Sequence, residues 1–543
     1  MSYGLPKTIA LVALLFIISQ VDNRLSSLLS GYQPHHSKAN TENPDYSGAA
    51  ATSSIPNQTF QIKHIYHHGA GEHYKVHRRL DITPDFISRH QLEAKRFSGS
   101  DLQQSSVPDS FQDVSPWTAK IPLNVDPAFP FRRLEDRSPD TIESYLKYIH
   151  SDIANINKVE LEWIDEVSPV PNVTDKNTVL NLAIMASNAY VGLPGTGDWK
   201  DVGIPWHNES SYGWMSDGLR GHVFVNEDES IVVISIKGTS AAYVSKLDVD
   251  GAQIIESLEY NNDEVTTLDG SDTVNNDKIN DNLLFSCCCA RVSYLWTTVC
   301  DCYKSSYTCD QKCLEKELRR DDRYYQAVLD LYRNVTSHYP KANVWVTGHS
   351  LGGALSALLA RTYGLPAVTF QAPGDLLATK RLHLPVPPGL PSDWEHVWHF
   401  GNTGDPIFMG VCNGASSTCS LGGYAMESQC HSGKTCIYDT VTDLGWSVSI
   451  YNHRIHAVID DVIMKYNETA ECRMPSPCQD CFNWKYVVDD SDDKYKTSTT
   501  KVPSSSKYKS CTTCSATSSS SVEHKCKKFN WLGKCVEWED DLN

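Results

Sequence analysis

Hydrophobic and polar positions follow two different periods between about residues 178 and 370. The segment 230–236 is almost continuously apolar and rich in Val and Ile, which predicts a strand buried on both faces, and the short segments 221–225, 343–347 and 366–370 also predict strands. The segments 179–190, 321–339 and 351–362 have the longer spacing of helices. Strands that alternate with helices predict an α/β fold with a parallel sheet.

The flanking regions have a different composition. Residues 25–60 are rich in Ser, Asn and Pro and predict a flexible stalk, and the end of the chain is rich in Ser, Thr and Lys with scattered Cys. We therefore expect a short N-terminus (1–7), an apolar segment (8–21), the stalk (25–60), an N-terminal region (61–175), a main domain (176–475) with a Cys-rich insertion (283–313), and a tail (476–543).

The N-terminal region carries no pattern that identifies a chemistry. It has several histidines, and the pair His67 and His68 could serve as metal ligands or could simply be exposed polar residues. Elsewhere we expect no metal site and no cofactor. The chain has 48 Lys and Arg against 66 Asp and Glu, a net charge of −18, which disfavours binding of nucleic acid through its phosphates.

The apolar segment 8–21 follows Lys7 and contains no charge. As a helix it would be ~21 Å long, shorter than a ~30 Å hydrocarbon core, so it could be a cleaved signal peptide or a retained signal anchor. We expect an anchor, which makes the chain a single-pass type II membrane protein with its body in the secretory lumen.

Two further features agree with a lumenal body. Glycosylation sequons occur at five positions, Asn57, Asn172, Asn208, Asn334 and Asn467. The 18 cysteines are crowded after residue 286, which predicts disulfides in an oxidising compartment. The pairs 478/481 and 511/514 also have zinc-ligand spacing, which leaves zinc as an alternative.

The motif that carries chemistry is G-x-S-x-G at residues 348–352. A β-branched strand precedes it and an Ala/Leu-rich helix follows it, as a nucleophile elbow requires. Ser350 would then lie on a strained turn, Gly348, His349 and Gly352 would form the rest of the elbow, and the amide of Leu351 would stabilise an oxyanion.

A serine nucleophile needs a base and a residue that orients the base. In this fold class the order along the chain is Ser, then Asp, then His. Asp405 follows a strand-like segment and a Gly turn and is our choice for the acid, with Asp439 as the alternative. His453 at the start of a helix is our choice for the base, with His456 as the alternative.

The segments GHSLGGAL, IKGTS, HFGNTGDPIF and NHRIHAVI together resemble class 3 (fungal-type) lipases over about residues 180–470. The resemblance implies an α/β-hydrolase-type lipase fold, and it assigns the second oxyanion donor to Thr239. Lys237 stands where the family's turn carries Arg. The stretch from residue 241 onward would be the lid, and the apolar part of the insertion could face a membrane or be a buried, disulfide-pinned loop.

The layout of the whole chain is similar to the autophagy-related vacuolar branch of this family. That resemblance implies a triacylglycerol lipase or phospholipase that lyses autophagic bodies and other intravacuolar vesicles. It also implies passage through multivesicular bodies to the vacuole lumen, membrane lipids as partners, and binding of phosphoinositides. The alternatives are a secreted esterase and an inactive hydrolase fold that only binds.

Overall fold

The computed structural model describes residues 57–89, 116–151, 155, 158–191, 200, 218–240, 271–291, 298–414 and 416–488, and the backbone of 526–529 and 535–538. All of these residues belong to the unit Ile55–Asn543. The segments β16 (Cys526–Phe529) and β17 (Cys535–Trp538) pair with each other as an antiparallel ribbon.

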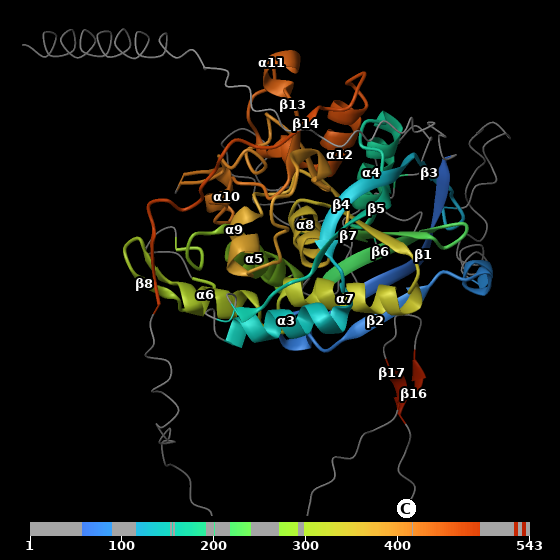
Figure 1. Ribbon diagram of the computed structural model, residues 1–543, viewed down its shortest axis with the longest axis horizontal. Coiled ribbons are helices and arrows are strands. Elements are labelled where there is room, and N and C mark those ends of the chain that lie inside the picture. The colour runs from blue at the N-terminus through green and yellow to red at the C-terminus, as the bar shows by residue number, and fades with distance from the viewer. Residues whose placement is uncertain are drawn as a thin grey trace, which may run out of the picture. The chain divides into compact units, whose positions relative to one another are not determined.

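One large sheet forms the centre of this unit, with the strand order β14-β13-β12-β11-β10-β7-β6-β1-β2 and β3 paired to β1 (Figure 1). The strands are β1 (Gln58–His68), β2 (His77–Asp81), β3 (Ile121–Leu123), β6 (Leu219–Asn226), β7 (Ile231–Ile236), β10 (Asn343–His349), β11 (Ala367–Phe370), β12 (Val397–Asn402), β13 (Lys434–Tyr438) and β14 (Cys472–Arg473). The four strands predicted from the apolar segments are all in this sheet.

The sheet is mixed, whereas the alternation of strands and helices predicts a parallel one. Strands β7, β10, β11, β12 and β13 are parallel, as expected. Strands β6, β1, β2, β3 and β14 are antiparallel to their neighbours. The reason is local, because only the short turn 227–230 joins β6 to β7, which leaves no room for a crossover helix. Strands from the region 61–175 thus share a sheet with the main domain.

Helices cover both faces of the sheet. They are α3 (Pro139–Ser151), α4 (Lys176–Asn188), α5 (Ser271–Phe285), α6 (Gln311–Leu318), α7 (Tyr324–His338), α8 (Leu351–Tyr363), α9 (Leu376–Arg381), α10 (Thr418–Leu421), α11 (Thr440–Leu444) and α12 (Ile455–Ala457). Short helical turns are η1 (Gly71–His73), η5 (Ser392–Trp394), η6 (Ile450–His453) and the π-helical η7 (Val458–Ile463). The helices predicted over 179–190, 321–339 and 351–362 correspond to α4, α7 and α8.

The alternation of side chains along β7 explains why a hydrophobic core and a layer of helices lie on each face of the sheet. Val232 and Ile234 pack into one core with α3, α5, α6, α7 and α8. Ile231 and Val233 pack into a second core with α4, α12 and η7 on the opposite face. A strand with apolar side chains on both faces reads as a continuous apolar run, which is why this segment was recognisable in the sequence.

Two smaller sheets lie beside the large one. The long hairpin β4 (Val125–Leu134) and β5 (Trp163–Pro171) is antiparallel. In the other, β15 (Lys485–Val487) runs parallel to β9 (Thr308–Asp310), which pairs with β8 (Tyr303–Ser305). The start of the predicted tail is therefore part of the folded body up to residue 488.

Seven disulfides join cysteines among the described residues: 287–481, 288–309, 289–300, 302–313, 412–419, 430–478 and 436–472. The prediction of disulfides is confirmed. Because Cys478 and Cys481 pair with Cys430 and Cys287, the zinc alternative is wrong for that pair. Cys511 and Cys514 lie outside the described residues.

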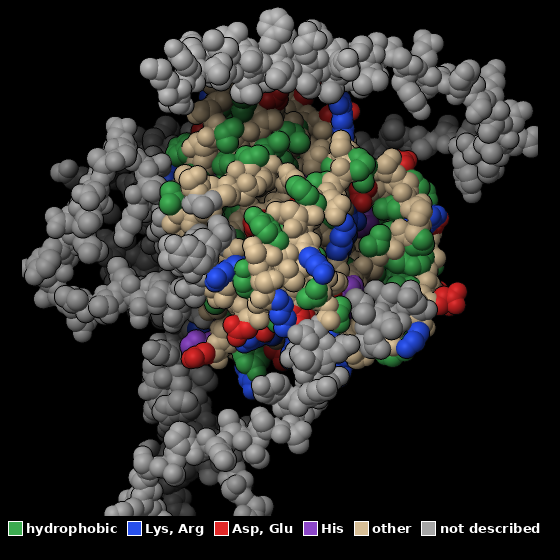
Figure 2. All heavy atoms as spheres, turned by 90° about the vertical axis from the view of Figure 1, so that its left-hand side faces the viewer, with side chains coloured by type: hydrophobic (Ala, Val, Ile, Leu, Met, Phe, Trp, Pro, Cys, Tyr) green, Lys and Arg blue, Asp and Glu red, His purple; other side chains and the backbone are tan. Residues whose placement is uncertain are grey.

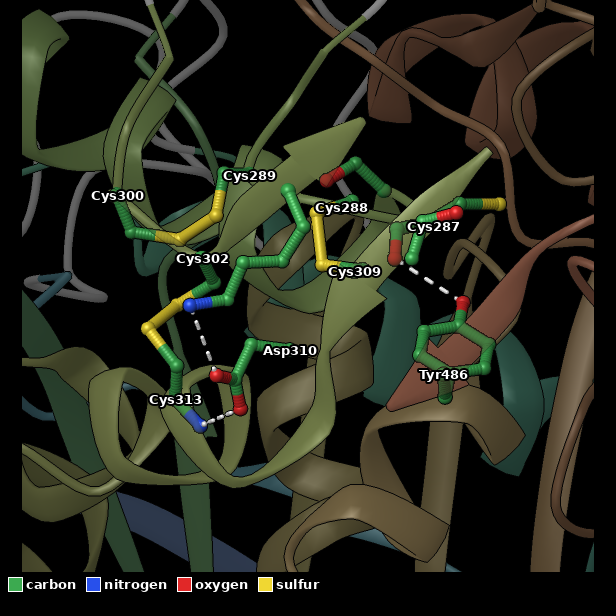
Figure 3. The surroundings of a disulfide bond; sticks show 12 residues. Cys287, Cys288, Cys289, Cys300, Cys302, Cys309, Asp310, Cys313 and Tyr486 are labelled. Carbon is green, nitrogen blue, oxygen red and sulfur yellow. Dashed lines mark hydrogen bonds and ion pairs between the residues drawn. A yellow bond between two sulfur atoms is a disulfide. The ribbon is translucent and has the colours of Figure 1, made fainter. Parts of the chain in front are cut away.

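The Cys-rich insertion is a buried, disulfide-pinned structure rather than a membrane-facing loop in its described part. Leu283, Leu284 and Phe285 are almost completely buried. Figure 3 shows three of the disulfides close together, next to Asp310, whose carboxylate accepts the backbone N–H of Cys313 at 3.1 Å. Residues 292–297, which include the remaining apolar part of the insertion, lie outside the described residues.

No helix that the structure describes is both long enough and apolar enough to cross a bilayer. This finding contradicts the prediction of a single-pass type II protein of the multivesicular body membrane. The segment that prompted it, residues 8–21, and the stalk up to residue 56 lie outside the described residues.

The surface carries hydrophobic side chains in small groups. Figure 2 shows such groups among basic, acidic and uncharged residues on the face at the left of Figure 1. Of the sequon residues, Asn57, Asn334 and Asn467 are exposed and Asn172 is half-buried, whereas Asn208 lies outside the described residues.

Candidate active site

The predicted elbow is the junction between β10 and α8, at the centre of the parallel strands. Ser350 has φ 55° and ψ −128°, a conformation that a residue other than glycine rarely adopts. Its backbone N–H donates to the carbonyl of Phe370 on β11 at 3.0 Å, which fixes the turn against the neighbouring strand. The side chain of Ser350 thus projects from a rigid bend between sheet and helix.

The glycines of the elbow allow backbone segments to approach closely. A Cβ on Gly352 would lie 2.2 Å from the carbonyl oxygen of Ile236, and one on Gly348 would lie 2.4 Å from the carbonyl oxygen of Gly352. Both distances are shorter than any real contact. The first turn of α8 therefore packs directly on the end of β7 only because residue 352 has no side chain.

The structure brings Ser350, His453 and Asp405 together in one chain of hydrogen bonds. The Oγ atom of Ser350 lies 2.8 Å from Nε2 of His453, and Nδ1 of His453 lies 2.7 Å from Oδ2 of Asp405. Asp405 is completely buried, and its Oδ1 accepts the backbone N–H of Ile407 at 2.8 Å. The carboxylate is held on both oxygens, so it can orient the imidazole.

A second set of contacts fixes the segment that carries His453. The side-chain amide of Asn452 donates to the carbonyl oxygens of Gly404 at 3.1 Å and Ser447 at 2.9 Å. The amide of Asn402, at the end of β12, donates to the carbonyl of Asn452 at 3.2 Å. The loop with Asp405 and the turn with His453 are therefore tied to each other through backbone groups.

His349 of the elbow also contacts this segment. Its Nε2–H donates to the carbonyl oxygen of His453 at 2.7 Å, and its Nδ1 accepts from the hydroxyl of Tyr190 at 2.7 Å. Burial keeps the pKa of the His349 imidazole well below its ordinary value, so the ring is neutral and can make both bonds. The elbow residue thereby positions the backbone of His453.

The two alternatives do not join this arrangement. Asp439 is the exposed N-cap of α11, where its carboxylate accepts the N–H of Thr442 at 3.2 Å and the hydroxyl of Thr403 at 2.9 Å. His456 lies one helical turn beyond His453, and burial lowers the pKa of its ring to about 4. The imidazole that is hydrogen-bonded to the Ser350 hydroxyl is that of His453.

The turn 237–240 follows β7 beside the elbow. The buried ammonium of Lys237, where the family resemblance leads us to expect Arg, donates to the carbonyl of Gly238 at 2.9 Å and to the hydroxyl of Ser240 at 2.7 Å, with Asp277 at 3.4 Å. Asp277 also accepts the N–H of Ser240 at 2.7 Å. Lysine is therefore sufficient to anchor this turn, and α5 supplies its counter-charge.

Thr239 at the centre of the turn is held from the same helix. Its hydroxyl donates to Oδ2 of Asp281 at 2.7 Å. Burial raises the pKa of the Asp281 carboxyl well above its ordinary value. Leu351, the other predicted oxyanion donor, is the first residue of α8 and is completely buried. The predicted lid, from residue 241 onward, lies outside the described residues up to residue 270.

Sequence reasoning missed four of the residues that build this site: Tyr190, Asp277, Asp281 and Asn452. Asn452 stands directly before His453, and this was a signal that could have been used. The two aspartates lie in an acidic, Asn-rich segment that resembles an exposed surface, and only their burial distinguishes them. Tyr190 lies just after the end of α4, about 160 residues before the elbow (sequence separation 159 from His349).

Comparisons with known proteins identify the family of the chain. The family model described as lipase (class 3) matches residues 281–364, which contain the elbow. Proteins named "Putative lipase ATG15" are similar over most of the chain. The one from Meyerozyma guilliermondii is 50% identical and covers 89% of this chain and 88% of its own. Those from Pichia angusta and Saccharomyces cerevisiae are 51% and 50% identical and cover 90% and 82% of this chain, and 83% and 84% of their own.

Solved structures are more distant. Lipase II from Rhizopus niveus is 12% identical, covers 44% of this chain and 74% of its own, and has a TM-score of 0.20, so it adds nothing to the topology described above. The high identity over nearly the full length of the curated relatives is decisive. The chain is a lipase and belongs to the class 3 lipase family, within the group of fungal ATG15 lipases.

Proposed function

We propose that this lipase uses Ser350 as the nucleophile, His453 as the general base and Asp405 as the residue that orients it. The observation that supports this proposal is the 2.8 Å contact between the Ser350 hydroxyl and Nε2 of His453, with Asp405 on the other ring nitrogen. In this reaction His453 takes the hydroxyl proton while the oxygen of Ser350 attacks the carbonyl carbon of an acyl ester.

The tetrahedral intermediate then collapses in the usual order. His453 gives its proton to the leaving alcohol oxygen, and the acyl group stays on Ser350 as an ester. A water molecule, deprotonated by His453, attacks this ester and releases the fatty acid and the free serine. Asp405 stabilises the imidazolium in both steps without taking its proton.

The oxyanion would be held by the backbone amides of Leu351 and Thr239. Each donor in such a site contributes about 3 kcal/mol to stabilisation of the transition state. The bonds from Thr239 to Asp281 and from Ser240 to Asp277 support this role, because they hold the turn rigid before substrate arrives.

The substrates we propose are membrane lipids, either phospholipid or triacylglycerol. The name of the ATG15 relatives favours lipids of membranes degraded in autophagy. Lysis of autophagic bodies stays a prediction from family resemblance. Binding of phosphoinositides stays a prediction that depends on family resemblance alone. The hydrogen-bonded arrangement of serine, histidine and aspartate argues against an inactive, purely binding version of the fold.

The test is release of fatty acid from phospholipid vesicles and from triacylglycerol emulsions near pH 5. Wild type and a control with an exposed serine replaced, Ser337→Ala, should release fatty acid at the same rate, and Ser350→Ala should release none above background. Equal release by Ser350→Ala would overturn the assignment of the nucleophile.

A further inference from the structure

Two histidines and an aspartate form a cluster on the edge of the sheet. His68, the last residue of β1, is paired across the hairpin with His77, the first residue of β2. Asp330 of α7 packs against this pair. Each of the three offers one ligand atom, and these atoms all lie within 4.8 Å of one another.

The two imidazole rings and the carboxylate are close to the geometry of a metal centre. Nε2 of His68 lies 3.0 Å from Oδ2 of Asp330, and the centroids of the His68 and His77 rings are 3.9 Å apart. Ligands ~2.0–2.2 Å from a tetrahedral Zn²⁺ are themselves separated by a little over 3 Å. The ligand atoms of the cluster lie within 4.8 Å of one another, and rotation of the exposed His77 ring can bring its nitrogen to the closer spacing.

The hydrogen bonds of His68 set a chemical constraint. Its Nδ1 lies 2.7 Å from the carbonyl oxygen of Gly69, which can only accept, so Nδ1 carries the proton. Its Nε2 faces a carboxylate oxygen, which is also an acceptor. A neutral His68 therefore directs a lone pair at Asp330. A cation between these two atoms resolves the conflict, and so does a second proton on His68.

The hydrogen bonds that surround His68 and Asp330 favour a bound cation over a second proton. Ligating histidines almost always donate their other ring N–H to a backbone carbonyl or carboxylate, and ligating carboxylates are themselves hydrogen-bonded. His68 donates to Gly69, and Oδ1 of Asp330 accepts from the side-chain amide of Gln326, one helical turn earlier, at 3.2 Å. Both features that orient ligands are present, and Oδ2 of Asp330 faces the histidines.

We propose that His68, His77 and Asp330 bind one divalent zinc ion. Two imidazole nitrogens and one carboxylate oxygen are a ligand set suited to Zn²⁺, and they leave a fourth position for water. His77 is exposed and the side chain of Asp330 is 33% exposed, so an ion can enter from solvent. The ion would clamp the edge hairpin β1–β2 to α7, the helix that leads into β10.

The experiment is a Zn²⁺ titration of the full chain at pH 7, after treatment with a chelator and its removal, by calorimetry and by competition with a metal indicator. Wild type should bind one zinc ion per chain at this site. His77→Ala should weaken binding at least about 100-fold, because losing a ligand exceeds the ~10–100-fold effect of losing an outer contact, and Gln326→Ala should fall within that smaller range.

The matched control is His73→Ala, which removes an exposed histidine of the same hairpin from outside the cluster. It should bind zinc as wild type does. Zinc should raise the melting temperature of wild type and His73→Ala but not of His77→Ala, whose melting temperature without zinc should be unchanged. Equal zinc binding by His77→Ala and wild type, or no binding to wild type at about 100 μM, would overturn the proposal.

Discussion

Asp277 is the residue through which α5 holds the turn 237–240, and replacing it with Asn tests how the oxyanion donors are positioned. Its Oδ2 accepts the N–H of Ser240 at 2.7 Å and lies 3.4 Å from the ammonium of Lys237, and its Oδ1 accepts the hydroxyl of Tyr324 at 2.6 Å. Both Asp277 and Lys237 are at least 96% buried, with side-chain exposures of 1% and 4%. An amide has only one accepting oxygen, so Asp277→Asn cannot keep all three bonds.

The expected cost in stability follows from this burial. Removing one partner of a buried ion pair destabilises a protein by about 3–5 kcal/mol, because the other charge is left uncompensated. Lys237 keeps two oxygen acceptors, and burial already lowers the pKa of its ammonium, so it can lose its proton. We therefore expect Asp277→Asn to lower the free energy of unfolding by about 3 kcal/mol, the lower end of this range.

The cost in activity follows from the position of Thr239. Loss of one oxyanion donor lowers kcat by about 10²–10³-fold. A turn that has lost its anchor but keeps its sequence retains part of this stabilisation, so we expect kcat of the folded enzyme to fall about 10–100-fold, with a smaller change in KM.

The assay is hydrolysis of a soluble short-chain ester, with kcat and KM measured separately, alongside urea unfolding. Asp321→Asn, the same change at an exposed carboxylate, is the control and should match wild type in both. The double variant Lys237→Met/Asp277→Asn should be less destabilised than the sum of the single variants. Unchanged kcat in folded Asp277→Asn would refute the reasoning.

Three further predictions concern the elbow, a disulfide and a buried acid. Gly352→Ala would place a Cβ 2.2 Å from the carbonyl oxygen of Ile236, so α8 must shift and the rate of ester hydrolysis should fall at least about 10²-fold. A variant with wild-type activity would contradict the close packing of α8 on β7. Replacing both Cys287 and Cys481, whose disulfide closes a loop with a sequence separation of 194, should lower the free energy of unfolding by about 2–5 kcal/mol in urea melts. An unchanged free energy of unfolding would argue against this disulfide. Burial raises the pKa of the Asp281 carboxyl, so the native state holds a proton that the unfolded state releases above about pH 4. The free energy of unfolding of wild type, relative to Asp281→Asn, should therefore fall as pH rises, by at most about 1.4 kcal/mol per pH unit. A difference that does not change with pH would show that Asp281 titrates normally.

The parts of the fold that were predictable have a local signal. The buried strand 231–236 is apolar on both faces, and the elbow is one contiguous motif between a strand and a helix. Beyond β6, the antiparallel half of the sheet had no such signal, because β1 carries histidines and other polar residues between its apolar positions. Its pairing with β6 depends on contacts about 160 residues apart along the chain (His64 with Val223).

The site shows the same division. Ser350, Asp405 and His453 could be selected because their order along the chain and the turns around them are restricted by the geometry of the elbow. The residues behind them are less restricted. Asp277 and Asp281 lie in a polar segment whose burial depends on the packing of α5, and nothing in the sequence distinguishes them from exposed carboxylates.

The proposed mechanism depends most on the nucleophilic hydroxyl of Ser350 and its base, His453. The direct measurement is the rate at which a fluorophosphonate labels the purified protein, with the labelled residue identified by mass spectrometry, in wild type, His453→Ala and His456→Ala. The proposed mechanism predicts label on Ser350 in wild type and at the same rate in His456→Ala, with a rate about 10²–10⁴-fold lower in His453→Ala. Label on a different residue, or rapid labelling of His453→Ala with none in His456→Ala, would contradict it.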